Sequence, residues 1–223
     1  MNVAIFDLDG TLVDTAPDII DALNRTLSDL DLSPIDEATG RNFIGSGAKS
    51  LVASGLMKSS KIPATESCLE AAYARFITYY TEACAKRSAL YPGVREGLDM
   101  LQDIGIAMGV CTNKPHALSL DVLDAFGLHK YFRAVVGGDV LPERKPAARH
   151  LLETAKRITP EFSHAIMIGD SPTDVAAAQN AAIPIVAVDY GYTTTPPANL
   201  GANVVISDMR DLPSMMLKFW KIA

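Results

Sequence analysis

Residues 3–12 read VAIFDLDGTL, a short apolar run that ends on two carboxylates, Asp7 and Asp9. The run lacks polar alternation and therefore predicts a strand buried on both faces of a parallel sheet. Carboxylates two positions apart at a strand end point in roughly the same direction. Gly10, which follows them, predicts a turn with unusual backbone angles. Because open parallel sheets bind ligands at their carboxyl edge, this stretch predicts an α/β fold with its chemistry at that edge.

Similar apolar runs recur along the chain, separated by segments of helix length. The expected strands are 3–6, 107–111, 134–136, 165–168, 185–188 and 204–206. The expected helices between and after them are 94–104, 115–126, 146–157, 173–182 and 212–221. This alternation predicts an α/β fold with a doubly wound, Rossmann-like parallel sheet.

One long interval interrupts this alternation, because about a hundred residues without a convincing strand separate the first two expected strands. Segments 17–30 and 66–86 carry apolar side chains at helical spacing. We predict a helical insertion, residues 15–87, in a core domain formed by residues 1–14 and 88–223. The chain would cross between the two parts near 13–15 and 89–92. Two crossings permit a hinged lid, although rigid packing on the core is the alternative.

The composition excludes several classes of protein. A chain of 223 residues with 48% hydrophobic residues can bury a core without disulfides and is not disordered. Its net charge of −6 argues against a nucleic-acid partner. Three cysteines without paired spacing indicate reduced thiols in a cytoplasmic protein. No apolar run approaches the ~20 residues that span a bilayer, so no membrane partner is expected, and the N-terminus lacks the pattern of a signal peptide.

Two polar motifs follow expected strands and open expected helices. Thr112 and Asn113 stand where the helix 115–126 begins, a corner suited to a phosphate, although Thr112 could simply cap that helix. Lys145 precedes Pro146, which suits the first turn of a helix. A solvated surface position is the alternative for a single lysine.

A third motif, GDSPTD over residues 169–174, follows the strand expected at 165–168. Ser171 is a good N-cap and Pro172 a good first helical residue. Asp174 then lies in the first turn and faces back toward Asp170. Acidic residues there could merely complement the helix dipole, but the strand is apolar right up to Asp170.

These motifs bring four carboxylates, a hydroxyl and an ammonium to one sheet edge. The residues are Asp7, Asp9, Asp170, Asp174, Thr112 and Lys145. Clustered carboxylates are costly to bury unless they are paired or bind a cation. Mg²⁺ takes oxygen ligands and keeps waters and substrate oxygens, so the pattern predicts a site for Mg²⁺ and a phosphate.

The motifs, in this order, resemble those of the haloacid dehalogenase (HAD) superfamily, and the resemblance covers essentially the whole chain, with the insertion in the place of the α-helical cap domain. Residues 7–18, DLDGTLVDTAPD, and the triplet TNK at 112–114 are similar in particular to phosphoglycolate phosphatases. That group often has Lys-Pro-x-Pro in the third motif, whereas residues 145–148 read KPAA here.

The resemblance implies a Mg²⁺-dependent phosphomonoesterase whose nucleophile, Asp7, forms an aspartyl-phosphate. Asp9 would protonate the leaving group and then take a proton from the hydrolytic water, while its backbone carbonyl ligates the metal. Asp174 would act through a metal-bound water or orient Lys145. The implied metal ligands are Asp7, Asp9, Asp170 and Asp174. The implied phosphoryl-binding groups are Thr112, Asn113 and Lys145.

Residues 43–49, FIGSGAK, are similar to the substrate-specificity segment of phosphoglycolate phosphatases, although a glycine turn between helices is equally open. Gly45 and Gly47 would let the backbone approach the substrate, with Arg41 or Lys49 available for a carboxylate. The expected partner is a small phosphorylated metabolite, with 2-phosphoglycolate as the best guess. The chain is expected to be a monomer or a homodimer.

Four other functions stay open from the residues alone. A sugar-phosphate enzyme of the β-phosphoglucomutase type lacks its usual His-Arg cap motif here, and pyrophosphate hydrolysis is a second alternative. Phosphonate hydrolases use a cap lysine, which Lys49 could supply, but they lack an aspartate at the position of Asp9. A non-catalytic binding module with this fold is disfavoured by the intact Asp7, Asp9, Lys145 and Asp170.

Overall fold

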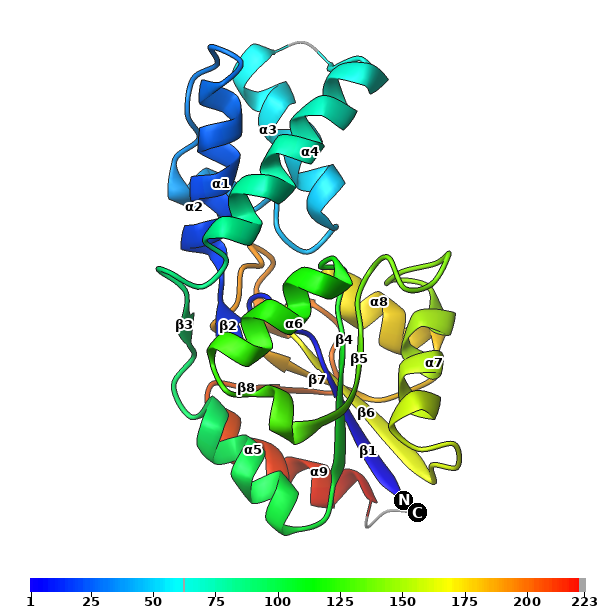
Figure 1. Ribbon diagram of the computed structural model, residues 1–223. Helices are drawn as coiled ribbons and strands as arrows, with labels where there is room; N and C mark the ends of the chain where they lie inside the picture. The colour runs from blue at the N-terminus through cyan, green and yellow to red at the C-terminus, as the bar shows by residue number, and fades with distance from the viewer. Residues whose placement is uncertain (62, 221–223) are drawn as a thin grey trace.

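The computed structural model describes residues 1–61 and 63–220 and contains a parallel sheet between two layers of helices (Figure 1). The sheet has the strand order β5-β4-β1-β6-β7-β8. Its strands are β1 (Asn2–Phe6), β4 (Ala107–Cys111), β5 (Phe132–Val136), β6 (His164–Gly169), β7 (Ile185–Val188) and β8 (Val204–Ile206). Every neighbouring pair is parallel. The predicted doubly wound α/β fold and its six strands are confirmed.

The two faces of the sheet bury separate cores, which explains the unbroken apolar runs. On β1, Ala4 and Phe6 pack into one cluster, whereas Val3 and Ile5 pack into the other. The first face is covered by α5 (Val94–Asp103), α6 (His116–Ala125) and α9 (Leu212–Trp220). The second face is covered by α7 (Ala148–Ile158) and α8 (Pro172–Asn180).

Two helices begin later than the sequence predicts. α7 starts at Ala148 rather than at Pro146, and its N-cap Ala147 is in an extended conformation. The preceding backbone is held by side chains, because Lys145 N–H donates to His150 Nδ1 at 3.0 Å. α6 starts one residue later than predicted, with Pro115 as its N-cap. The predicted end of the last helix, residue 221, lies outside the described residues.

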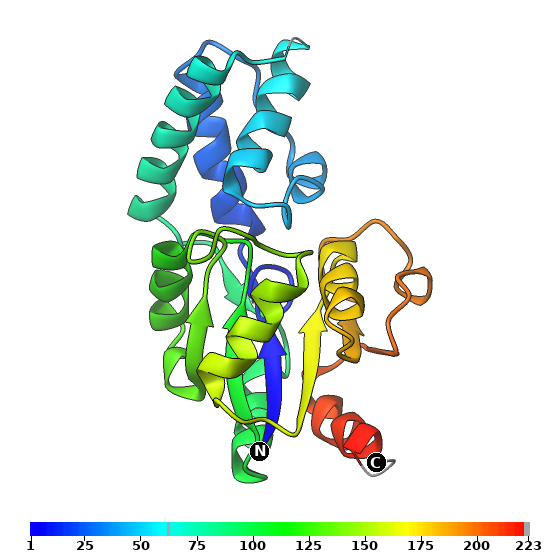
Figure 2. The ribbon, with the colours of Figure 1, turned by 90° about the vertical axis from the view of Figure 1, so that its right-hand side faces the viewer.

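Four helices stand apart from the sheet, beyond the carboxyl ends of its strands, toward which the arrows in Figure 2 point. They are α1 (Ala16–Ser28), α2 (Glu37–Arg41), α3 (Ala48–Ser60) and α4 (Glu66–Glu82), and we call them the cap. The cap has its own apolar core, which includes Leu23, Val52 and Phe76. A Cβ at Gly55 would lie 2.7 Å from Leu23 Cδ1, so this glycine permits close packing of α3 on α1.

The chain enters and leaves the cap through β2 (Val13–Asp14) and β3 (Ala89–Leu90), which pair antiparallel. The expectation that no strand lies between β1 and β4 is therefore wrong. Two-residue strands are too short to produce a hydrophobic period, which is why the sequence does not reveal them. The division of the chain at residues 15 and 87 stays a prediction.

Within residues 1–61 and 63–220, no helix combines the length and the apolar character that a membrane span requires.

Candidate active site

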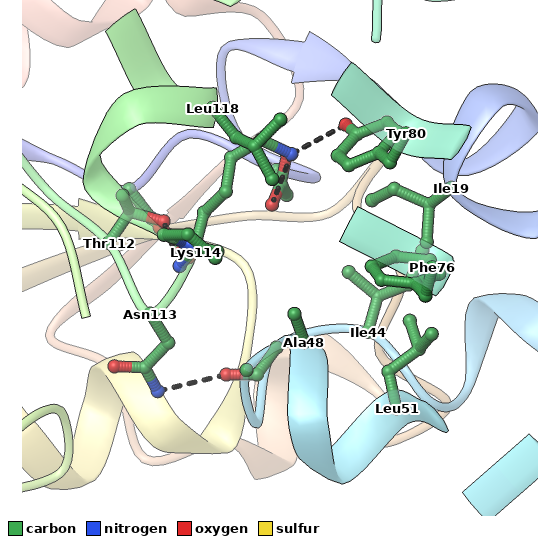
Figure 3. Close-up of a pocket in the computed structure, with 15 residues that line it drawn as sticks. Ile19, Ile44, Ala48, Leu51, Phe76, Tyr80, Thr112, Asn113, Lys114 and Leu118 are labelled. Atoms are coloured by element: carbon green, nitrogen blue, oxygen red, sulfur yellow. Dashed lines mark hydrogen bonds and ion pairs between the residues drawn. The ribbon is translucent and has the colours of Figure 1, made fainter. Parts of the chain in front are cut away.

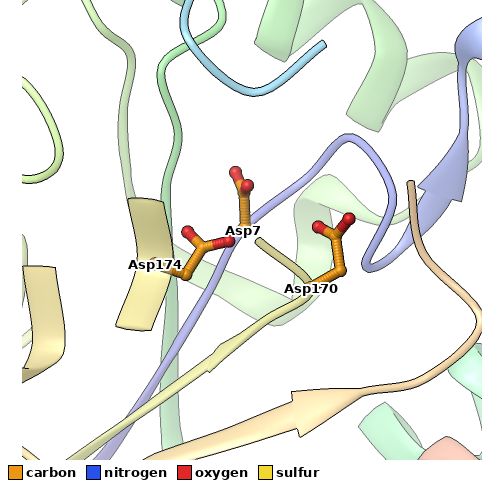
Figure 4. Close-up of side chains that lie close together, drawn as sticks. All are labelled: Asp7, Asp170 and Asp174. Atoms are coloured by element: carbon orange, nitrogen blue, oxygen red, sulfur yellow. The ribbon is translucent and has the colours of Figure 1, made fainter. Parts of the chain in front are cut away.

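Three carboxylates meet at the carboxyl edge of the sheet (Figure 4). Asp7 follows β1, and its N–H donates to the carbonyl of Ile168 on β6 at 2.9 Å, which aligns the two strand ends. Asp170 follows β6, and Asp174 comes from the first turn of α8. One oxygen of each carboxylate lies within 4.8 Å of the others, and all three side chains are buried. This spacing suits the oxygen ligands of one divalent cation.

A capping box fixes the start of α8 and the direction of Asp174. Ser171 Oγ accepts from the Asp174 N–H at 3.3 Å, and Asp174 Oδ2 accepts from the Ser171 N–H at 3.1 Å. Ser171 as N-cap and Pro172 as first helical residue, both predicted, are confirmed. The other oxygen, Asp174 Oδ1, accepts from Lys145 Nζ at 2.6 Å. Both oxygens of Asp174 are therefore engaged, an arrangement suited to orienting Lys145.

Two glycines, Gly10 and Gly191, pack closely against the Asp170 side chain. Thr11 Oγ1 donates to one of its oxygens at 3.1 Å and the Tyr192 N–H to the other at 2.8 Å. Gly10 has φ +85°, as its turn predicts, and a Cβ there would lie 2.6 Å from an Asp170 oxygen. A Cβ at Gly191 would lie 2.2 Å from Asp170 Cβ. Side chains at these two positions would displace the carboxylate.

The charges of this cluster are not balanced by protein groups. Burial, opposed by Lys145 and reinforced by Asp174, raises the pKa of Asp7 to about 6. Burial, then the charges of Asp174 and Asp7, raises the pKa of Asp170 to about 8. Lys145 Nζ lies 2.9 Å from Asp7 Oδ1 and contacts Asp174, and these two carboxylates raise its pKa against the cost of burial. Among the described residues, Lys145 is the only cation in contact with this cluster, and it contacts two of the three carboxylates, which leaves room for a further cation.

These shifts predict how the stability of the metal-free protein depends on pH. Since the folded-state pKa values of Asp7 and Asp170 lie above the ordinary 3.8, the folded protein binds more protons than the unfolded chain between about pH 4 and 8. The Tm in EDTA should therefore fall as pH rises through this window. Added Mg²⁺ should raise the Tm most near pH 8. Asp170→Asn should flatten the EDTA profile, and a Tm in EDTA that falls no less steeply in this variant would contradict the assignment.

Asp9 does not belong to the cluster of Asp7, Asp170 and Asp174, and its carboxylate has other partners. Its Oδ1 accepts from Thr15 Oγ1 at 2.6 Å and from Lys114 Nζ at 3.0 Å. Lys114 also contacts the Tyr80 hydroxyl of α4 at 2.6 Å, and its side chain is 2% exposed. The sequence places Lys114 in the triplet TNK at 112–114 but does not indicate a function for it. Its role in the site becomes evident only from its contacts with Asp9 and Tyr80, which are distant in the sequence.

Thr112 and Asn113 follow β4 and lie at the junction of core and cap. Thr112 is buried, and its Oγ1 accepts from the Lys114 N–H at 3.3 Å rather than capping α6. Asn113 Nδ2 donates to the carbonyls of Gly45 and Lys145, both at 3.0 Å. The Asn113 amide therefore links the cap at Gly45 to the core at Lys145.

A cavity lies between cap and core above these residues (Figure 3). Its core side includes Asp7, Asp9, Thr112, Asn113 and Lys114. Its cap side includes Ile19, Ile44, Gly45, Gly47, Leu51 and Phe76. Gly45 and Gly47 have φ values of 106° and 94°, which side chains rarely adopt. The predicted glycine segment thus lies at the cavity.

The two cap cations singled out from the sequence have protein partners. Arg41 forms a bidentate pair with Asp14, both contacts at 3.0 Å, and lines a neighbouring hollow beside Asp170. Lys49 Nζ binds Glu66 and Glu70 on α4, and the lysine lines neither cavity. Their predicted substrate contacts would require these pairs to open.

Several known proteins are similar to this chain in sequence or in structure. The phosphoglycolate phosphatase of Agrobacterium fabrum is 40% identical over 211 residues, covering 94% of this chain and 90% of the relative. The one from Rhodospirillum rubrum is 42% identical, covering 93% of this chain and 88% of the relative. A crystal structure of a predicted phosphoglycolate phosphatase from Haemophilus somnus superposes with a TM-score of 0.87 at 31% identity, covering 96% and 97% of the two chains.

The match to a family of enzymes extends across cap and core. Residues 4–188, which include every strand-end motif described above, match the family described as haloacid dehalogenase-like hydrolase. The similarity to the Haemophilus somnus structure covers 96% of this chain and so includes both the sheet and the inserted helices. The chain therefore belongs to the haloacid dehalogenase-like hydrolase family.

Proposed function

We propose that this protein is a Mg²⁺-dependent phosphomonoesterase that hydrolyses a small phosphorylated metabolite, best represented by 2-phosphoglycolate. The observation that carries the proposal is the position of Asp7. It borders the cavity, contacts Lys145 and is one of the three clustered carboxylates. The names of the relatives at 36–42% identity support the substrate. The free cysteines support a cytoplasmic protein, and the net charge of −6 supports one without a nucleic-acid partner. The protein would act as a monomer or homodimer.

The hydrogen bonds of Asp7 support its role as the nucleophile. Leu8 N–H and Lys145 Nζ both contact Oδ1, at 2.8 and 2.9 Å. Among the described residues Oδ2 has no such partner, so this oxygen attacks phosphorus while the bond from phosphorus to the leaving oxygen breaks. The product is an aspartyl-phosphate on Asp7.

Asp9 completes the reaction as acid and base. Its carboxyl group, which borders the same cavity, gives a proton to the departing alkoxide. The resulting carboxylate then takes a proton from a water that attacks phosphorus and releases phosphate from Asp7. Thr112 Oγ1 and Lys145 Nζ hold the phosphoryl oxygens during both steps.

The acidic cluster fits Mg²⁺. Asp7, Asp170 and the backbone carbonyl of Asp9 would hold the ion, while Asp174 orients Lys145. Burial and the charges of Asp174 and Asp7 raise the pKa of Asp170, and a bound cation would offset both effects. When bound, Mg²⁺ offsets the repulsion between carboxylate and phosphate and stabilises charge on the transferring group.

A panel of phosphate esters tests this function. With Mg²⁺, kcat/KM should be highest for 2-phosphoglycolate and lower for sugar phosphates, pyrophosphate and p-nitrophenyl phosphate. EDTA should abolish turnover, and Mg²⁺ should restore it. Equal rates across the panel would contradict the substrate, and phosphate release from none of the esters would contradict a phosphatase.

A further inference from the structure

Lys114 is the one lysine or arginine, among the described residues, that lines the cavity above Asp7. Lys145 lies beneath it on Asp7 and Asp174, whereas Arg41 and Lys49 are paired elsewhere. The cavity wall around Lys114 is largely apolar and includes Ile19, Ile44, Leu51, Phe76 and Leu118 (Figure 3). A ligand that extends from Asp9 into the cavity toward the cap would therefore lie beside the Lys114 ammonium.

The ammonium of Lys114 is oriented from both parts of the protein. Nζ lies 3.0 and 3.3 Å from the two oxygens of Asp9 and 2.6 Å from the hydroxyl of Tyr80, which is 2% exposed on α4. An ammonium has three N–H donors. The contact with the second Asp9 oxygen, at 3.3 Å, is the longest of the three, so a further acceptor can replace it while Asp9 Oδ1 and Tyr80 stay bound. Lys114 is thus preorganised for a further acceptor at the boundary of cap and core.

We propose that Lys114, positioned by Tyr80, determines specificity by binding a carboxylate on the substrate's leaving group. The proposal rests on the phosphatase function proposed above. Since Asp9 protonates the ester oxygen, the first atoms of the leaving group lie beside Asp9, and Lys114 lies against the same carboxyl group. A carboxylate one carbon from that oxygen can therefore reach the ammonium.

The remaining wall favours the same class of substrate. A charge-assisted hydrogen bond in a water-poor cavity favours an anion over a neutral group of the same shape. Apolar side chains offer no partners to the several hydroxyls of a sugar, which would lose their hydrogen bonds to water on entry. The cavity therefore selects a short 2-phosphorylated acid over a sugar phosphate.

The test compares 2-phosphoglycolate with 2-hydroxyethyl phosphate, in which a neutral CH₂OH replaces the carboxylate. For Lys114→Met, the ratio of kcat/KM values for the two esters should fall on the order of 100-fold, the effect of a lost hydrogen bond between charged groups. Loss of support for Asp9 lowers both rates by a common factor and cancels in the ratio. Tyr80→Phe, which keeps the ring, should raise KM more for 2-phosphoglycolate than for the neutral ester.

Lys156→Met, on the exposed side of α7, is the matched control and should leave the ratio unchanged. Equal losses for both esters in Lys114→Met would overturn the specificity assignment, as would a wild-type enzyme that hydrolyses both equally well. In either case the phosphatase function stands. If the wild-type protein hydrolyses neither ester with Mg²⁺, the phosphatase function itself fails. Should Lys114→Met not fold, the Tyr80→Phe comparison decides, and unchanged KM values there overturn the proposal.

Discussion

Asp7→Asn should lower kcat for every phosphate ester by about 10⁴-fold or more, the scale seen when a covalent nucleophile is removed. The carboxylate oxygen that attacks phosphorus is replaced by an amide, which is not nucleophilic at this position. Lys145 keeps its 2.6 Å contact with Asp174, so the phosphoryl-binding side of the site persists. Steady-state phosphate release with Mg²⁺ measures the effect.

The fold of the Asp7→Asn variant should remain intact. The amide has the shape of the carboxylate and removes a buried charge whose raised pKa of about 6 reports an unfavourable environment. In EDTA its Tm should therefore not fall below that of the wild type at pH 8. Intact mass of freshly purified protein excludes deamidation back to the original residue. A well-folded variant with more than a tenth of wild-type activity would contradict the assignment of the nucleophile.

Lys145→Met should have the largest effect on stability. The Lys145 side chain is 1% exposed and its ammonium contacts Asp7 and Asp174, so its loss leaves buried carboxylates without a protein cation. Breaking one side of a buried ion pair costs about 3–5 kcal/mol. Urea unfolding in EDTA at pH 7.5 should show this loss in the free energy of unfolding. Turnover should fall as well, because the phosphoryl group loses its positive partner.

Two variants control the Lys145 experiment. Lys156→Met removes an exposed lysine of α7 and should change the free energy of unfolding by no more than about 0.5 kcal/mol. The double variant Lys145→Met/Asp174→Asn also removes one of the carboxylates that lost its partner. Its free energy of unfolding should therefore be higher than that of Lys145→Met alone. If Lys145→Met costs less than about 1 kcal/mol, the ammonium is not the main compensation for these carboxylates.

The sequence predicts the sheet well because its inner strands, such as β4 and β7, are buried on both faces. Runs such as 107–111 contain no polar interruption, and in the structure Ala107–Cys111 is buried throughout. The Asp7 and Asp170 motifs are likewise local, since each follows a strand directly. Position along a strand therefore suffices to bring these two carboxylates together.

Pairings between distant segments are what the sequence does not reveal. Lys114 and Asp9 are 105 positions apart, and only the folded chain shows that they form a buried pair. Lys49 appears available beside the glycine segment, yet α4 brings Glu66 and Glu70 onto it. α3 is not evident from the sequence because its apolar residues follow only a weak helical period around Gly55. These details depend on packing between helices rather than on local pattern.

Phosphate should pass through a covalent bond to Asp7, and mass spectrometry of acid-quenched enzyme detects this intermediate. Asp9→Asn removes the base that activates the hydrolytic water, while p-nitrophenyl phosphate needs little help from an acid to form the intermediate. This variant should therefore accumulate a phosphoryl adduct in the presence of Mg²⁺, and peptide mapping should place it on Asp7. Slow turnover without any adduct, or an adduct on another residue, would contradict the account.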